Sequence, residues 1–225
     1  MEDNRLEIFC KLEYVGIDVD PPTIDISLQN GSMLRGSITI GVSAADGISG
    51  VKSMELYIDD TLVYLTLSSE ISYRWNTEEY VDGPHVVEVV AYDAVNNSKR
   101  IHARVTTDNT APSINIYSPD NESYVSGIVK INFSAEDNIA GVDRAELYIN
   151  DSLIEVYNES PAVYNWNTSM YCDGNYTIRI LAVDKLGNID VIKIVVVVDN
   201  VAPTLDIMAP ESGEHLRGRV SISAW

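Results

Sequence analysis

Residues 50–59 read Gly-Val-Lys-Ser-Met-Glu-Leu-Tyr-Ile-Asp, and residues 141–150 read Gly-Val-Asp-Arg-Ala-Glu-Leu-Tyr-Ile-Asn. In the first stretch the apolar residues Met54, Leu56 and Ile58 alternate with polar or amphipathic ones. Strict alternation is typical of a β-strand that has one buried face and one solvated face. The near copy that follows 91 residues later predicts that a whole folding unit, and not a single strand, has been duplicated.

The duplication extends over most of the chain. Eight identities recur at the same spacing: Gly36/Gly127, Gly50/Gly141, Tyr57/Tyr148, Trp75/Trp166, Asp82/Asp173, Ala91/Ala182, Asp93/Asp184 and Asn97/Asn188. Within the first copy, alternating segments separated by Gly, Asn, Asp and Ser predict strands at 23–28, 37–44, 51–59, 62–67, 71–75, 85–92 and 99–106. Seven short strands in about ninety residues indicate an all-β protein made of tandem immunoglobulin-like, Greek-key β-sandwiches.

Short proline-containing linkers separate the units. Proline fixes φ and favours an extended conformation in the residue before it, so we expect stiff joints. The predicted division is a C-terminal strand remnant of a preceding unit at 1–18, one domain at 19–108, a second at 109–199, and the truncated start of a third at 200–225. This division predicts that the sequence is a section of a longer array.

Charge excludes several classes of partner. Asp and Glu number 34 against 15 Lys and Arg, which gives a formal net charge of −19. Nucleic acids and anionic membrane surfaces both require clustered positive charge. No apolar run reaches the length of a membrane span, and residues 1–20 lack the pattern of a signal peptide. Cys10 and Cys172 are not repeated, so we expect both to be free thiols.

A family resemblance follows from the repeated positions. The segments Glu55-Leu56-Tyr57-Ile58-Asp59, Trp75-Asn76-Thr77, Asp82-Gly83 and Ala91-Tyr92-Asp93, with their second copies, resemble the Ig-like domains of bacterial and archaeal proteins. Such modules occur in tandem in secreted and cell-surface proteins. The resemblance implies an extracellular or cell-surface location, with neighbouring Ig-like units of the same chain as the first partners. Among such modules, spacers, adhesins and enzyme appendages share one fold.

No pattern in the chain indicates catalysis. The three histidines, His85, His102 and His215, are not repeated, and no residue stands in an activated-nucleophile motif. We therefore expect a protein that is not an enzyme. The repeated Trp75 and Trp166 are expected to pack between the sheets, where a large aromatic side chain contributes most. An exposed position, stacked on a sugar ring, is the alternative.

Tyr57 and Tyr148 form a candidate contact face. Alternation places them on the opposite side of their strands from Leu56 and Leu147, which are expected to be buried. Such a face would bind cell-surface glycans or proteins. Cross-strand pairing is the ordinary alternative.

Acidic and amide side chains gather in the loops expected at one end of each unit. Asp46 and Asp93 lie in two loops that an Ig-like topology brings to the end where the chain enters. Such oxygens suit Ca²⁺, and the Asp-Asn-x-Ala-Pro linkers resemble cadherin junctions, although the further acidic motifs of cadherins are absent. Turns made by Asp and Asn with their own backbone are the alternative. The candidate ligands are Asp20, Asp46, Asp93, Asn97, Asp108, Asn109, Asp137, Asp184 and Asn188.

Glycosylation sequons are more frequent than chance. Eight Asn residues precede x-Ser/Thr: Asn30, Asn96, Asn121, Asn132, Asn150, Asn158, Asn167 and Asn175. This excess predicts an exported glycoprotein. The function predicted from the sequence is a non-catalytic spacer segment of an extracellular array. The alternatives are an adhesin-type module for glycans or surface partners, and an accessory carbohydrate-binding module of a secreted hydrolase.

Overall fold

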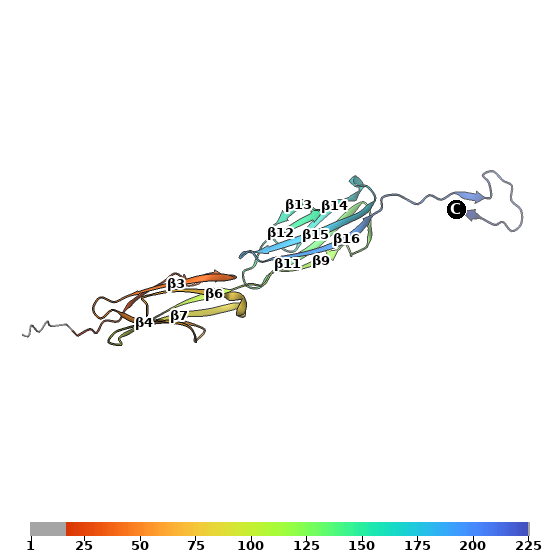
Figure 1. Cartoon of the computed structure of the whole chain (residues 1–225). Coiled ribbons are helices and arrows are strands. Elements are labelled where there is room, and N and C mark those ends of the chain that lie inside the picture. Colours follow the sequence, from red (N-terminus) through yellow and green to blue (C-terminus); the bar gives the residue numbers. More distant parts are fainter. Residues whose placement is uncertain (1–16, 225) are drawn as a thin grey trace, which may run out of the picture. The chain divides into compact units, whose positions relative to one another are not determined.

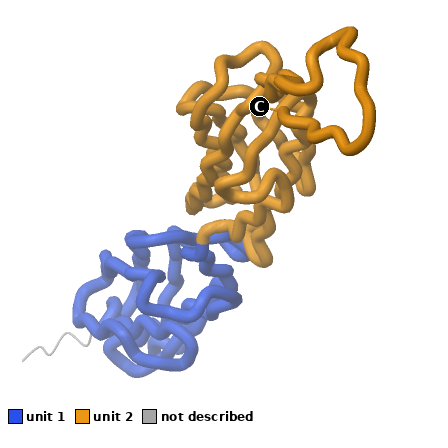
Figure 2. Tube along the Cα trace, turned by 90° about the vertical axis from the view of Figure 1, so that its right-hand side faces the viewer, with its two compact units in different colours: residues 1–110 blue, residues 111–225 orange. Residues whose placement is uncertain are grey.

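The computed structural model describes residues 17–224, and the regular secondary structure of this part of the chain is almost entirely β-strand (Figure 1). The chain divides between Thr110 and Ala111 into two compact units, called unit 1 and unit 2 (Figure 2). Of the expected strand remnant at 1–18, only Ile17 and Asp18 belong to the described residues, and Cys10 lies outside them. No helix within 17–224 is long and apolar enough to cross a membrane.

Unit 1 is a sandwich of two sheets. The three-stranded sheet has the order β1-β3-β6, with β1 (Thr23–Ile26), β3 (Ser37–Ala45) and β6 (Glu70–Asn76). The five-stranded sheet has the order β2-β8-β7-β4-β5, with β2 (Met33–Leu34), β8 (Ser98–Thr107), β7 (Gly83–Asp93), β4 (Val51–Ile58) and β5 (Thr61–Thr66). A 3₁₀ turn, η1 (Thr77–Glu79), follows β6. The predicted all-β class is confirmed.

Unit 2 repeats this topology. Its three-stranded sheet has the order β14-β11-β9, with β9 (Ser113–Ser118), β11 (Ile128–Glu136) and β14 (Ala162–Asn167). Its five-stranded sheet has the order β10-β16-β15-β12-β13, with β10 (Tyr124–Val125), β12 (Val142–Ile149), β13 (Ser152–Tyr157), β15 (Gly174–Asp184) and β16 (Ile189–Val198). The turn η2 (Thr168–Met170) corresponds to η1. After β16, β17 (Ile207–Ala209) pairs with β18 (Ser223–Ala224).

Each unit has its own hydrophobic core. The alternation on β4 is realised as predicted, because Met54, Leu56 and Ile58 are at most 1% exposed. Trp75 and Trp166 are each 1% exposed and pack between the sheets. Each indole also meets a neighbouring tyrosine ring edge-to-face. The sheets are therefore held together by burial of the repeated apolar positions, and the loops at their ends are free to carry polar side chains.

Candidate functional site

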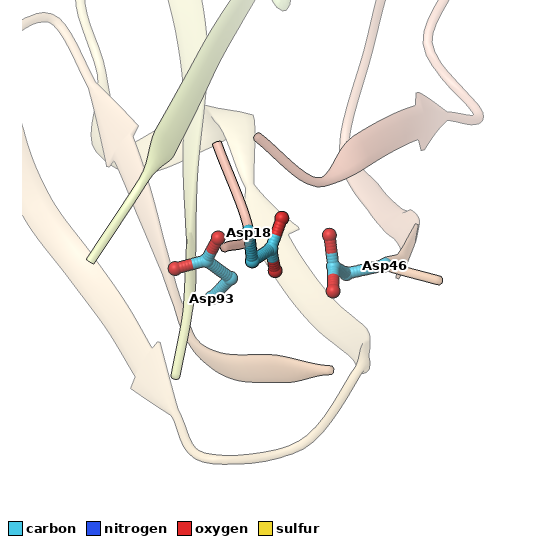
Figure 3. Close-up of side chains that lie close together, drawn as sticks. All are labelled: Asp18, Asp46 and Asp93. Carbon is cyan, nitrogen blue, oxygen red and sulfur yellow. The ribbon is translucent and has the colours of Figure 1, made fainter. Parts of the chain in front are cut away.

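Three carboxylates of unit 1 lie together at one end of the sandwich. Asp46 follows β3, Asp93 ends β7, and Asp18 lies ahead of β1. One oxygen from each lies within 4.8 Å of the others. Figure 3 shows the Asp18 side chain between those of Asp93 and Asp46. We call these residues the acidic triad.

The loop after β3 folds around the Asp46 carboxylate. Its Oδ1 accepts hydrogen bonds from the backbone N–H groups of Ile48, Ser49 and Gly50 at 3.1, 2.9 and 2.7 Å. Gly50 has a φ of +77°, which suits glycine and lets the loop turn back into β4. Burial disfavours the charged form of Asp46, but these hydrogen bonds outweigh it and hold the pKa of the carboxyl below its ordinary value. Asp46 is therefore a carboxylate near neutral pH.

Asp93 is fixed by its own loop in the same way. Its side chain is completely buried, and Oδ1 accepts from the backbone N–H groups of Val95 and Asn97 at 3.0 and 2.7 Å. The Asn97 amide group donates to Asp93 Oδ2 at 2.6 Å and to the backbone oxygen of Asp18 at 3.3 Å. The Asn97 side chain thus acts as a hydrogen-bond donor here, and it connects the entering chain at Asp18 to the end of β7.

Asp18 is the member of the triad that the sequence analysis missed. Its Oδ2 accepts from the Ser49 N–H at 3.1 Å, and its Oδ1 accepts from the Asp20 N–H at 3.2 Å. Asp20, the predicted linker ligand, is exposed and lies outside the cluster. The spacing between Pro22 and Pro112 is 90 residues, not 91, because unit 2 has one extra residue between its first two strands. Alignment on these prolines would have paired Asp18 with Asp108.

Unit 2 builds the same two loops. Asp137 Oδ1 accepts from the Gly141 N–H at 2.6 Å. Asp184 Oδ1 accepts from the Asn188 N–H at 2.8 Å, and its Oδ2 accepts from the Asn188 amide at 2.6 Å. The Lys185 ammonium lies 3.4 Å from the point where a Cβ on Gly141 would stand. Unit 1 has Ala94 in place of this lysine.

Asp108 and Asn109 close the far end of unit 1. Asp108 is completely buried, and its N–H donates to the Leu34 carbonyl. Asn109 Oδ1 accepts from the Gly36 N–H at 2.8 Å and from the Thr77 hydroxyl at 3.0 Å. Both the backbone N–H and the side-chain amide of Asn109 donate to Asp82 Oδ1.

Asp82 is the anchor of that network. The Thr110 hydroxyl donates to Asp82 Oδ2 at 2.5 Å. Burial opposes ionisation of Asp82, but the bonds from Thr110 and Asn109 prevail and lower its pKa. Asp82 precedes the first residue of the eleven-residue strand β7, and Asp93 is the last. A strand of this length spans about 35 Å, so Asn109 and Asp93 lie at opposite ends of unit 1.

A Thr–His–Asp chain lies beside this network, with Thr107 and His85 buried and the Asp59 side chain 45% exposed. His85 Nδ1 is 2.5 Å from Asp59 Oδ2, and His85 Nε2 is 3.1 Å from the Thr107 hydroxyl. The order of groups is that of a hydrolase triad. However, Thr107 is 0% exposed, and the imidazole packs edge-to-face against Trp75 and Tyr80. Because a nucleophile must reach the carbonyl that it attacks, these residues hold the core together and cannot bind a substrate in this conformation.

The family follows from the fold and from the sequence match together. The family model described as bacterial Ig domain matches residues 22–89 and 112–180, which is more than half of the chain. The chain belongs to the bacterial Ig domain family. Each of the two matched segments lies within one of the two units, so the predicted family resemblance is confirmed.

Several solved structures match this chain over most of its length. The fibronectin(III)-like modules of CbhA from Clostridium thermocellum match at 18% identity and a TM-score of 0.43, over 79% of this chain and 94% of that one. A 1.5-MDa bacterial ice-binding adhesin matches at 14% identity and a TM-score of 0.45, over 87% of this chain and 71% of that one. SGBP-B of Bacteroides ovatus, in complex with a mixed-linkage heptasaccharide, matches at 14% identity and a TM-score of 0.29, over 80% of this chain and 48% of that one. The chain thus spans about half of SGBP-B. No curated protein matches it significantly.

The predicted tyrosine face differs between the two Ig domains. The Tyr57 hydroxyl donates to Glu55 at 2.7 Å, and the Tyr148 hydroxyl donates to Glu146 at 2.5 Å. In the second domain the Arg179 guanidinium also lies 3.7 Å from the centre of the Tyr148 ring. Both tyrosines are half-buried. Tyr148 is therefore covered by a cation–π contact, and Tyr57 is the better candidate of the two for an external partner.

The sequon asparagines lie at the surface of both Ig domains, except one. Asn132 is half-buried on β11, and the other seven are exposed: Asn30, Asn96, Asn121, Asn150, Asn158, Asn167 and Asn175. Several of them use Oδ1 to accept a hydrogen bond, as Asn30 does from the Arg104 N–H at 2.9 Å. Glycan attachment uses the amide nitrogen, so this bond can persist in a modified protein. Cys172 is an exposed free thiol.

Proposed function

We propose that the chain is a non-catalytic spacer segment of an array of Ig domains on an extracellular or cell-surface protein. The supporting observation is that the repeated polar positions are used to build the module itself. Asp82 and Asn109 fasten the last strand of the first domain, and Asp46 and Asp93 fasten its loops. Side chains engaged in this way stabilise a fold and leave little for a substrate.

Single-molecule pulling on the 225-residue chain tests the spacer function. Two domains that carry load independently unfold in two separate events, each releasing about 30 nm of chain for about ninety residues. A glycan array on the same protein should show no saturable binding. One cooperative rupture of both domains, or saturable binding to a defined glycan, would contradict the proposal.

A binding role for glycans or surface proteins is the alternative, and the same array separates it from a spacer. In that case Tyr57→Ala should lower affinity without lowering the melting temperature, because the Tyr57 side chain is half-buried and outside the core. A role as a carbohydrate-binding module of a secreted hydrolase requires binding to the polymer that the hydrolase cleaves. Mass spectrometry of the native protein tests whether the exposed sequons carry glycans.

We also propose that the acidic triad of the first domain binds Ca²⁺. The support is its charge: three carboxylates lie within 4.8 Å of one another, and none forms an ion pair with a lysine, arginine or histidine among residues 17–224. Like charges at this distance repel, and a divalent cation would replace repulsion by attraction. It would also fasten the entering chain to the loops after β3 and β7. Asp137 and Asp184 are the second domain's counterparts of Asp46 and Asp93.

Calorimetric titration of the full chain with CaCl₂ tests this site. Ligand at about a hundred times its dissociation constant stabilises the domain that binds it by about 2.7 kcal/mol, so its melting temperature should rise. Asp46→Asn should abolish the binding heat of the first domain, while the exposed Asp25→Asn serves as a matched control. The absence of both a binding heat and a shift in melting temperature would contradict the proposal.

A further inference from the structure

Strand β5 forms one edge of the five-stranded sheet of unit 1. It pairs with β4 and with no other strand in the described part of the chain. The backbone N–H and C=O groups on its other side therefore face outward. Such an edge is a template for one more strand.

The sequence of β5 has neither a charged residue nor a proline, which are two of the usual protections of an edge strand. From Thr61 to Ser69 there is no charged residue. Leu62, Leu65 and Leu67 are 48%, 55% and 77% exposed. Natural edge strands are commonly protected by a charged side chain, a proline or a bulge.

Unit 2 shows what protection looks like in the same fold. Its edge strand β13 has the exposed Glu155 at the position of Tyr64 in β5. Both edges share a bulge, since the register shifts between Leu56 and Tyr57 in one ladder and at the equivalent point in the other. The bulge therefore does not distinguish the two edges, and the central charge does.

The charges around β5 indicate what kind of strand it can accept. Asp60 precedes the uncharged segment, Glu70 follows it as the first residue of β6 in the three-stranded sheet, and both are exposed. Glu55 lies opposite Leu65 on the neighbouring strand. The edge thus offers an apolar centre between acidic ends, which is complementary to an extended segment that has apolar residues in its middle and basic residues at both ends.

The same charges disfavour a second copy of this chain as the partner. If β5 paired with itself in an antiparallel ladder centred near Tyr64 and Leu65, the exposed Asp60 of one copy would approach the end of β5 in the other, where Glu55 lies opposite Leu65 and Glu70 begins β6. Like charges facing each other across a ladder are destabilising.

We propose that the free edge of β5 binds an extended segment of another protein, with an apolar centre and Lys or Arg at its ends, as an added β-strand. Main-chain hydrogen bonds would supply the attraction, and the flanking carboxylates would select the partner. Unit 2 would not bind such a segment, because Glu155 occupies the middle of its edge strand.

The probe for this proposal is a fluorescein-labelled peptide, Lys-Lys-Val-Thr-Val-Thr-Val-Lys-Lys, added to the 225-residue chain in a fluorescence anisotropy titration. We expect saturable binding with one site per chain. A peptide with Glu in place of every Lys should bind at least about tenfold more weakly. A peptide that is N-methylated at alternate residues should not bind, because it cannot donate along that edge.

Variants of the protein locate the site. Tyr64→Glu copies the edge of unit 2 and should weaken binding at least about tenfold. Leu65→Ser is a second variant, and because Leu65 is half-exposed it should not disturb folding. Glu155→Tyr should create a second binding site on β13.

Three results would overturn the proposal. Equal binding of the Lys-flanked and Glu-flanked peptides would show that the acidic residues do not select the partner. Undiminished binding of the N-methylated peptide would show that the peptide does not bind as an added β-strand. A dimer in sedimentation velocity that Tyr64→Glu dissociates would assign the edge to a second copy of the chain.

Discussion

The two units place different side chains at the same point of the same fold. In unit 1, His85 Nε2 lies 2.9 Å from the Val81 carbonyl oxygen. In unit 2, the Tyr176 hydroxyl donates to the equivalent carbonyl, that of Cys172, at 3.0 Å. Both rings pack edge-to-face against the core tryptophan. The fold therefore requires a hydrogen-bond donor on an aromatic ring at this position, and not one particular residue.

A second pair of positions changes together with the first. Asp59 Oδ1 accepts from the Val86 N–H at 2.9 Å, and Asn150 Oδ1 accepts from the Thr177 N–H at 2.8 Å. Asp59 differs from Asn150 in that its other carboxylate oxygen also contacts the His85 ring. The comparison teaches that the shared function of each position is structural, and that its chemistry differs only where a neighbour differs.

The largest expected effect comes from the core tryptophans. Trp75→Ala should destabilise unit 1 by about 3–5 kcal/mol, because a fully buried indole leaves a large cavity. Trp166→Ala should do the same to unit 2. Differential scanning calorimetry of the full chain should show one transition lowered and the other unchanged. A joint shift of both transitions would contradict the idea that each unit is stabilised by its own core.

The exchange of His85 and Asp59 for the residues of unit 2 should be strongly non-additive. His85→Tyr alone removes the partner of Asp59, and Asp59→Asn alone removes the carboxylate next to the imidazole, so each should cost about 1–3 kcal/mol in urea unfolding. The double variant reproduces the unit 2 arrangement and should recover part of that loss. A coupling free energy near zero would show that the two positions vary independently.

The third test concerns the lysine near the acidic loops of unit 2. Ala94→Lys should place an ammonium beside Gly50, because Ala94 and Lys185 donate to equivalent glycine carbonyls at 3.1 and 3.0 Å. If the acidic triad binds Ca²⁺ as proposed, a cation at this distance should weaken binding at least about tenfold. Ala94→Met is the neutral control of similar length. Unchanged affinity in Ala94→Lys would show that the lysine has no influence on the site.

The fold was predictable from the sequence because buried and solvated positions alternate along each strand. The predicted strand at 51–59 and the observed β4 differ by one residue, whereas β2 was not predicted because two residues are too short to show a period. The 91-residue spacing of the repeated identities predicted a duplicated folding unit, independently of the role of any single residue. Local pattern was sufficient for the longer strands because each of them carries its own signal.

The site was predictable only in part. Asp46 and Asp93 were expected at the same end because loop order follows from topology, and the structure brings them together. Asp18 was missed because one extra residue between the first two strands of unit 2 changes the spacing of the linkers and the strands that follow them from 91 to 90 residues. Asn109 was assigned to the entrance of the second unit, but its bonds to Asp82 span 27 residues, and no local pattern reveals a contact of that range.

The smallest expected effect lies at the network around Asp82, where unit 1 has Thr110 and unit 2 has Val201. Thr110→Val should cost about 1 kcal/mol at pH 7, because one hydrogen bond to a carboxylate is lost. The Asp82 pKa is lowered in the folded unit, so its contribution to stability is present above the unfolded value near 3.9 and is lost as pH falls through the lower folded value. Urea unfolding of both proteins should therefore show a difference at pH 7 that shrinks towards pH 2. A difference that is constant with pH would mean that the Thr110 hydroxyl stabilises unit 1 by some contact other than the one to the Asp82 carboxylate.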